Sequence, residues 1–254
     1  MHSFSLYPDI PYQTFGEGQR FITLLNGFMR PQKDFGKIAK ILSKEGFKVI
    51  TMDFRGSGSH TVSNPFSIQD LASDVERVWS KVGVKKTALI GISMGGIVAQ
   101  ELLHRNKDIL NQVTLVSTSR SIQELRKPSP NWEEGSANIL QKYVSTHFNK
   151  QHKVLIQAMG KAMDTMWQDA QHKQAGEWQR HAIQNWVPPN KPHASIPVCV
   201  LHGSEDLVFP ISSAIDLSKN YQASMHIFDG HGHLLIAESP QELYAVILEQ
   251  LSVL

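Results

Sequence analysis

The chain has 254 residues, 41% of them hydrophobic, and a formal net charge of +2, with Lys and Arg scattered along it. A chain of this length fits one large α/β domain or two small ones, and it can bury a full core without disulfides or metals. The scattered charge lacks the basic stripe of nucleic-acid-binding proteins, so no nucleic-acid partner is expected.

Signals for targeting are absent from the sequence pattern. Residues 1–6 show no basic segment followed by an apolar stretch, so no signal peptide is expected. No apolar run approaches the roughly 20 residues that span a bilayer. The single cysteine, Cys199, excludes an internal disulfide and lies in the apolar run 196–201, where we expect a buried core thiol. These patterns predict a soluble cytoplasmic protein with no membrane partner.

Short apolar runs alternate with segments of helical spacing over the first 120 residues. Ser67 and Asp70 form a capping box, which predicts a helix running towards Val82. Strands alternating with helices of this length indicate crossover units and a parallel sheet. The expected strands cover residues 21–25, 47–52, 87–92 and 113–116. Two further helices are expected at residues 35–42 and 97–103.

Between residues 121 and 192 the pattern changes to one without a convincing strand. Ala158, Met159, Met163, Met166 and Trp167 recur at helical spacing, which indicates the inner face of a helical insert. The same side chains are also able to line a pocket, because Met and Trp make adaptable apolar walls. The two interpretations are compatible. The insert contains the tryptophans Trp132, Trp167, Trp178 and Trp186.

After Pro197 the alternation of strands and helices resumes. Strands are expected at 196–201 and 225–228, and helices at 211–219 and 240–251. The simplest organisation is therefore an α/β core interrupted by a helical insert.

The segment Gly91-Ile92-Ser93-Met94-Gly95-Gly96 places a serine where an expected strand gives way to an expected helix. A serine on so tight a corner takes a strained backbone conformation that pushes its Oγ out above the sheet. Gly91 and Gly95 are required because a Cβ at either position would collide with the turn or the neighbouring helix. The free N–H groups at the helix start face whatever Ser93 attacks.

Two further residues complete a candidate catalytic set. A serine hydroxyl becomes an effective nucleophile when a base takes its proton and an acid orients that base. Asp206 follows the expected strand 196–201, and His233 follows the expected strand 225–228. The order Ser93, Asp206, His233 is the nucleophile–acid–base order of one known triad architecture.

Together these motifs resemble the α/β-hydrolase superfamily over nearly the whole chain outside the insert. The resemblance implies an α/β-hydrolase fold with a mostly parallel central sheet and helices on both faces. It also implies a core of residues 1–120 and 193–254 and a helical cap at 121–192. The segments that carry it are Asn26-Gly27-Phe28, the glycine-rich turn from Asp53 to Ser59, the G-x-x-D turn from Gly203 to Asp206, and Gly232-His233 followed by Glu238 and Pro240.

The resemblance also implies an oxyanion hole made of backbone N–H groups, with Met94 and Phe28 as the donors. The chain has Asn26-Gly27 where the commonest family pattern has His-Gly, and we expect Asn26 to hold the loop by hydrogen bonds. Arg30 faces either the pocket, where it would favour an acidic substrate, or solvent. The expected pocket residues are Asn26, Arg30, Met159, Met163 and Trp167.

Neighbouring titratable residues offer alternatives to the chosen set. Asp206 is preferred to Glu205 by its position in the turn, and His233 is preferred to His231 by its spacing from the last helix. His202 is expected to pack or to make a local hydrogen bond. A metal site formed by His226, His231 and His233 lacks a ligand-bearing helix or cysteine to support it. Arg55 is expected to organise its loop.

The sequence thus predicts hydrolysis of a carboxylic ester of a small, apolar acyl substrate through an acyl-enzyme, with no metal or organic cofactor required. A serine nucleophile argues against haloalkane dehalogenases and epoxide hydrolases, which use an aspartate. Carboxylesterases, enol-lactonases, thioesterases and carbon–carbon bond hydrolases share the serine triad and stay open. A non-hydrolytic role, as a lyase, a cofactor-free oxygenase or a ligand-binding protein, is the alternative from a different class. The oligomeric state is left open.

Overall fold

The computed structural model describes residues 9–105, 108–128, 135–189 and 196–252. The predictions made for residues 1–6, for Trp132 and for the boundary at 192–193 fall outside these ranges. All other elements and side chains discussed below lie within them.

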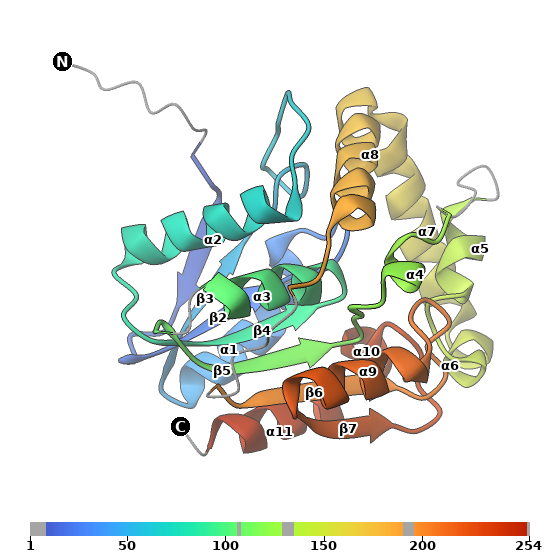
Figure 1. Cartoon of the computed structure of the whole chain (residues 1–254). Helices are drawn as coiled ribbons and strands as arrows, with labels where there is room; N and C mark the ends of the chain where they lie inside the picture. The colour runs from blue at the N-terminus through green and yellow to red at the C-terminus, as the bar shows by residue number, and fades with distance from the viewer. Residues whose placement is uncertain (1–8, 106–107, 129–134, 190–195, 253–254) are drawn as a thin grey trace.

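A seven-stranded sheet forms the centre of the molecule, in the order β1-β3-β2-β4-β5-β6-β7 (Figure 1). Strands β2 to β7 are parallel, and only β1 runs antiparallel, against β3. The mostly parallel sheet predicted from the alternating pattern is confirmed. The strands are β1 Tyr12–Phe15, β2 Arg20–Leu25, β3 Phe47–Met52, β4 Thr87–Ile92, β5 Leu110–Val116, β6 Val198–Gly203 and β7 Ser224–Phe228.

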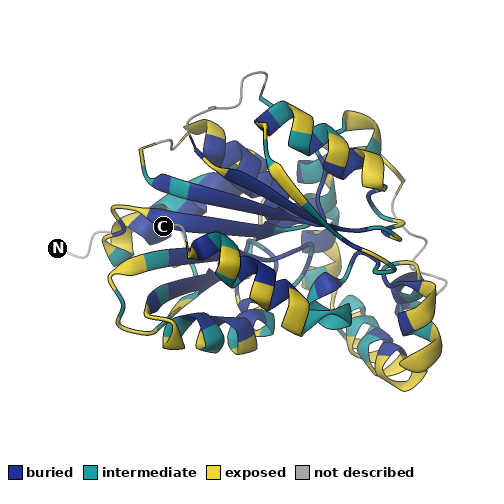
Figure 2. Cartoon of the chain, turned by 90° about the horizontal axis from the view of Figure 1, so that it is seen from below, coloured by how far each residue is buried: buried dark blue, intermediate teal, exposed yellow. Residues whose placement is uncertain are grey.

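Helices cover both faces of this sheet and bury its strands (Figure 2). One face packs against α2 (Ile68–Val82), α3 (Met94–Arg105) and α9 (Ile211–Tyr221). The other face packs against α1 (Gly36–Lys44) and α11 (Pro240–Leu251), with the short η1 (Gln32–Phe35) and α10 (Leu235–Glu238) beside them. Because the apolar side chains of each strand point alternately to these two faces, the runs that looked uniformly apolar in the sequence are buried on both sides.

The start of α2 shows how the sequence sets an element boundary. The Ser67 hydroxyl accepts the Asp70 amide at 3.1 Å, and the Asp70 carboxylate accepts the Ser67 amide at 2.8 Å. This is the predicted capping box. The helix ends at Gly83, whose φ of 79° is readily adopted by glycine.

Between β5 and β6 the described residues form helices and no strand. Figure 1 shows these helices at the edge of the sheet where the parallel strands end. Met159, Met163, Met166 and Trp167 are half-buried, whereas Ala158 is exposed and lies on the outer face, contrary to the predicted stripe. We call this stretch the α4–α8 segment: α4 Ile122–Leu125, α5 Ser136–Gln141, α6 Thr146–Gln151, α7 Lys153–Gln168 and α8 Ala170–Asn185.

Cys199 is buried between the sheet and α11, as expected, and burial raises the pKa of its thiol. Within the described ranges, no helix is both long enough and apolar enough to cross a bilayer. Strand β1 and helix α10 were not predicted.

Candidate active site

Ser93 sits on the sharp turn between β4 and α3, with a φ of 52°. Its amide donates to the Val116 carbonyl at 2.9 Å, which ties the turn to the neighbouring strand β5. A Cβ at Gly91 would lie 2.4 Å from the Gly95 carbonyl oxygen, and one at Gly95 would lie 2.2 Å from the Leu25 carbonyl oxygen. Both glycines are therefore required, as the motif predicted, and the corner holds Ser93 in a strained conformation.

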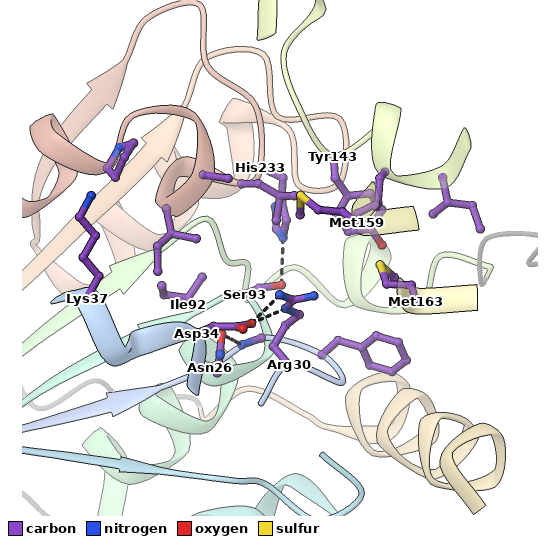
Figure 3. A pocket seen from close by; sticks show the side chains of 18 of the residues that line it. Asn26, Arg30, Asp34, Lys37, Ile92, Ser93, Tyr143, Met159, Met163 and His233 are labelled. Atoms are coloured by element: carbon purple, nitrogen blue, oxygen red, sulfur yellow. Dashed lines mark hydrogen bonds and ion pairs between the residues drawn. The ribbon is translucent and has the colours of Figure 1, made fainter. Parts of the chain in front are cut away.

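The structure brings Ser93, His233 and Asp206 into one chain of hydrogen bonds. His233 Nδ1 lies 2.8 Å from Asp206 Oδ2, and His233 Nε2 lies 3.0 Å from Ser93 Oγ. Because a carboxylate only accepts, Nδ1 carries the proton and Nε2 is left to accept the serine hydroxyl. Figure 3 shows the Ser93 and His233 side chains pointing toward one another. This geometry lets the imidazole act as a base toward the serine.

Asp206 is held as a charged acceptor. Its Oδ1 accepts the amides of Val208 at 2.8 Å and Phe209 at 2.9 Å. Burial favours the protonated acid, but the facing His233, the nearby His202 and the Phe209 amide together outweigh it, so the pKa of Asp206 lies below its ordinary value. An ionised carboxylate at this position fixes the imidazole tautomer.

The competing titratable residues have other partners. Glu205 accepts the Thr146 amide at 3.2 Å, and His231 Nδ1 donates to the Asp229 carbonyl at 2.8 Å. His226 lies 3.7 Å from Glu242. None of these contacts leads to Ser93.

His202 makes the expected local hydrogen bond. Its Nε2 donates to the Phe209 carbonyl at 2.9 Å, and the ring is fully buried. Nε2 also lies 3.5 Å from Asp206 Oδ2, the oxygen that faces His233.

The histidine loop is tied to the α4–α8 segment. The Tyr143 carbonyl accepts the amides of His233 at 2.9 Å and Leu234 at 3.0 Å. Glu238 joins the same two parts, because its Oε1 accepts the Gly232 amide at 3.0 Å and its Oε2 accepts the Ser145 amide at 2.9 Å. This part of the segment therefore fixes the position of the imidazole.

The loop after β2 carries Phe28, one of the two residues expected to supply an oxyanion donor. Asn26 accepts the Gly27 amide through Oδ1 and donates to the Pro31 carbonyl through Nδ2, both at 2.9 Å, so it braces the loop as predicted. A Cβ at Gly27 would lie 3.4 Å from the Ser93 Cβ, which places the loop directly beside the serine. Within the described part of the chain, the amides of Phe28 and Met94 have no hydrogen-bond partner and are available to a ligand.

A cavity of about 410 Å³ opens above Ser93 and His233. Four of the residues expected in the pocket line this cavity: Asn26, Arg30, Met159 and Met163 (Figure 3). Apolar side chains from α5, α10 and the histidine loop make up much of the remaining wall: Ile139, Leu140, Leu234, Ile236 and Ala237. The volume falls in the range of small-molecule sites.

Two pocket predictions need refinement. Trp167 does not line this cavity: it stacks on Phe28 with ring centroids 6.3 Å apart and supports the loop from behind. Arg30 lines the cavity and is also partly exposed, and its Nε donates to Asp34 at 2.7 Å. The guanidinium is thus already paired with the carboxylate of Asp34, in the neighbouring η1.

The turn from Asp53 to Ser59, expected to be structural, is held by contacts with the rest of the core. Arg55 pairs with the buried Asp74 through two hydrogen bonds of 2.6 and 2.9 Å. Asp53 accepts the Gln32 amide at 2.7 Å and the Ser59 amide at 3.0 Å. These contacts anchor the turn to the core below the cavity.

Two residues of the site carry no recognisable signal in the sequence. Tyr143 lines the cavity beside His233, and burial, followed by the charge of Asp206, raises its pKa to about 12. Its phenol therefore stays protonated near neutral pH. Gln179, on α8, is fully buried and accepts the Met29 amide at 2.8 Å.

The parallel sheet, the serine turn and the acid and histidine loops define the α/β-hydrolase class. The chain belongs to the family described as "Serine aminopeptidase, S33", whose model matches residues 16–240. A curated protein of Synechocystis, named as a non-heme chloroperoxidase, is 25% identical over 249 residues, covering 89% of each chain.

Solved structures show the same fold. An α/β hydrolase from a Medee basin deep-sea metagenome library superposes with a TM-score of 0.83 at 15% identity, over 95% of this chain and 93% of that one. The enol-lactonase of Burkholderia xenovorans LB400 superposes with a TM-score of 0.81 at 18% identity, over 96% of each chain.

Proposed function

We propose that this protein is a serine hydrolase that cleaves a carboxylic ester, lactone or thioester of a small apolar acyl group. The observation that carries the proposal is the chain of hydrogen bonds from Asp206 through His233 to Ser93, at 2.8 and 3.0 Å, beneath a cavity with apolar walls. The α4–α8 segment serves as the cap that shapes this cavity.

The mechanism follows from the geometry. His233 Nε2 takes the proton as Ser93 Oγ attacks the carbonyl carbon, and Asp206 stabilises the resulting imidazolium. The amides of Phe28 and Met94 stabilise the oxyanion. His233 then protonates the leaving group, whose bond to the acyl carbon breaks, and next activates water to release the acid from Ser93. These steps use only side chains and amides of this chain.

The family description and the relative's name suggest other activities. An aminopeptidase binds the α-ammonium group of its substrate, for which a free carboxylate in the cavity is suited. Among the described lining residues the sole carboxylate is Asp34, and it already faces Arg30. The apolar walls therefore favour an acyl group over a peptide N-terminus. The enol-lactonase named above favours including lactones among the esters to be tested.

The test is Ser93→Ala against Ser213→Ala, assayed with p-nitrophenyl esters and a fluorophosphonate probe. Ser213 is buried, lies on α9 and does not line the cavity, and its hydroxyl has no hydrogen-bond partner among the described residues. We expect Ser93→Ala to lose both turnover and labelling, and Ser213→Ala to keep both. Labelling that persists in Ser93→Ala contradicts the proposal.

The substrate class is tested on the native enzyme. Rates are compared across p-nitrophenyl esters of increasing chain length, lactones, aminoacyl p-nitroanilides, and halide with hydrogen peroxide. We expect the esters or lactones with apolar acyl groups to be turned over fastest. Faster release of p-nitroaniline, or peroxide-dependent halogenation without ester turnover, contradicts the proposal.

A further inference from the structure

We propose that Gln179 is a positioning residue for the oxyanion loop, linking helix α8 to the Phe28–Met29 peptide. The inference rests on the proposed function, because it concerns the loop whose Phe28 amide would stabilise the oxyanion. Gln179 itself does not line the cavity, so it acts through the backbone that it holds.

Both N–H groups and the oxygen of the Gln179 side-chain amide are hydrogen-bonded. Its Oε1 accepts the Met29 amide at 2.8 Å, and its Nε2 donates to the Arg55 carbonyl and the Ser57 hydroxyl, both at 2.8 Å. The Met29 N–H is only a donor and the Arg55 carbonyl only an acceptor, so the two contacts fix which end of the side-chain amide is oxygen. The side chain is fully buried, where each such bond lacks competition from water.

Helix α8 is a firm support for this contact. It approaches the turn below the cavity so closely that a Cβ on Gly56 would lie 2.4 Å from the Ala175 Cβ. Ala175 precedes Gln179 by four residues and so lies on the same face of the helix. The helix and the turn therefore present Gln179 to the loop in one fixed orientation.

The loop needs such a support because its backbone is strained. Met29 has a φ of 55°, a left-handed conformation that costs a non-glycine residue about 1–2 kcal/mol. Rotation of the Phe28–Met29 peptide would relieve this strain. Gln179 opposes that rotation, because a rotated peptide would leave the buried Gln179 Oε1 without its donor.

The peptide on the other side of Phe28 is held independently. Its carbonyl, from Gly27, accepts the Arg30 amide at 3.2 Å. In a planar trans peptide the N–H points opposite to the C=O, so the Phe28 N–H is directed out of this turn. Arg30 and Gln179 thus hold the two peptides that flank Phe28, and releasing one of them loosens the position of the oxyanion donor.

The experiment compares Gln179→Leu with Gln112→Leu. Gln112 is also buried, but its side chain donates to the Gln250 carbonyl near the chain end, far along the sequence from the loop. For both variants, kcat and KM are measured on the best p-nitrophenyl ester. The concentration of active sites is determined by titration with the fluorophosphonate, and the rate constant of fluorophosphonate labelling is measured separately. Titration corrects for any loss of folded protein.

For Gln179→Leu we expect kcat and the labelling rate to fall by about tenfold to a hundredfold, with KM changed by less than about threefold, because a displaced oxyanion donor acts on the transition state. Gln112→Leu is expected to keep both rates within about twofold. A Gln179→Leu enzyme with rates as close to wild type as the Gln112→Leu enzyme overturns the inference.

A second substitution distinguishes two roles of Gln179: holding the strained loop, or only stabilising the packing of α8. Glycine adopts the left-handed conformation without strain, so the double variant Met29→Gly with Gln179→Leu is expected to recover at least fivefold in the labelling rate over Gln179→Leu. No recovery contradicts the role of Gln179 in holding a strained turn. Where Gln179→Leu does not fold, Ser57→Ala removes one of its three contacts and is expected to lower the labelling rate two- to fivefold, and an unchanged rate overturns the inference.

Failure of the proposed function gives a different result. If wild-type Ser93 is not labelled at all, both the proposed function and this inference fall. If wild type and Gln179→Leu are labelled equally fast, only the inference falls.

Discussion

The ring of Tyr143 meets the imidazole of His233 edge-on, with centroids 5.4 Å apart, while the Tyr143 carbonyl accepts the His233 amide. One residue of the α4–α8 segment therefore holds both the backbone and the ring of the candidate base. A ring packed against an imidazole restricts its rotation and excludes water from one of its sides.

This contact predicts different outcomes for two Tyr143 variants. Tyr143→Phe keeps the ring and is expected to retain kcat within about threefold. Tyr143→Ala removes the wall beside His233 and is expected to lower kcat at least tenfold, because a misplaced base transfers the proton less efficiently. Steady-state rates per titrated active site measure both. Equal losses of kcat in the two variants would show that kcat depends on the phenol oxygen of Tyr143 rather than on its ring.

Met163 is expected to limit acyl length. Met163→Ala should shift the preferred p-nitrophenyl ester to a longer chain, since each additional buried methylene contributes about 0.8 kcal/mol, or roughly fourfold in kcat/KM. Met166→Ala is the matched control: Met166 lies on the same helix but does not line the cavity above Ser93. A shift in both variants, or in neither, contradicts the assignment of Met163 to the acyl wall.

His202 makes stability depend on pH. Burial lowers the pKa of His202 below its ordinary value of about 6.5. As the pH falls through this value, His202 binds a proton in the unfolded chain but stays neutral in the folded protein. The folded state therefore loses stability as the pH falls from 7.5 to 5. In His202→Gln this contribution is absent, and the difference in melting temperature from wild type should narrow over the same range. His147→Gln, at an exposed histidine, should keep the wild-type dependence, and a constant His202→Gln difference would refute the prediction.

The serine turn predicts a contrast between two glycines. In Gly95→Ala the new Cβ would lie 2.2 Å from a main-chain oxygen, and we expect a loss of at least about 2 kcal/mol in unfolding free energy. Gly36→Ala, in α1, meets nothing within 4 Å and is expected to be neutral or to stabilise by up to about 1 kcal/mol. Urea unfolding followed by circular dichroism compares the two. Similar losses in both would contradict the steric explanation.

Sequence patterns within a few residues correctly predicted those helices and strands whose bounds depend on short-range interactions. Strands β3 and β4 and helix α2 have the expected bounds, because apolar runs, a capping box and glycine stops are all short-range signals. Strand β1 was missed because its four residues show no alternation and depend on pairing with β3, more than 30 positions away.

The residues of the candidate site also fall into two groups: those with a local sequence motif and those identified only by tertiary contacts. Ser93, Asp206 and His233 stand in turns with their own motifs, and the structure brings them within hydrogen-bond distance. Gln179 has no such motif: it is one of several glutamines in a polar helix, and only the packing of α8 on the core distinguishes it from Gln171 or Gln184. Tyr143 likewise depends on a contact with a residue 90 positions away.

The hydrogen bonds between residues 143–146 and the loops after β6 and β7 limit where the α4–α8 segment can be exchanged with that of another α/β hydrolase. A chimera that changed the course of this stretch would displace the main-chain acceptor of the His233 amide and the main-chain donors to Glu205 and Glu238. The first junction therefore belongs after α6, with residues 143–146 kept as part of the core. The second belongs before Ala175, so that the native face of α8 stays with the loop it supports.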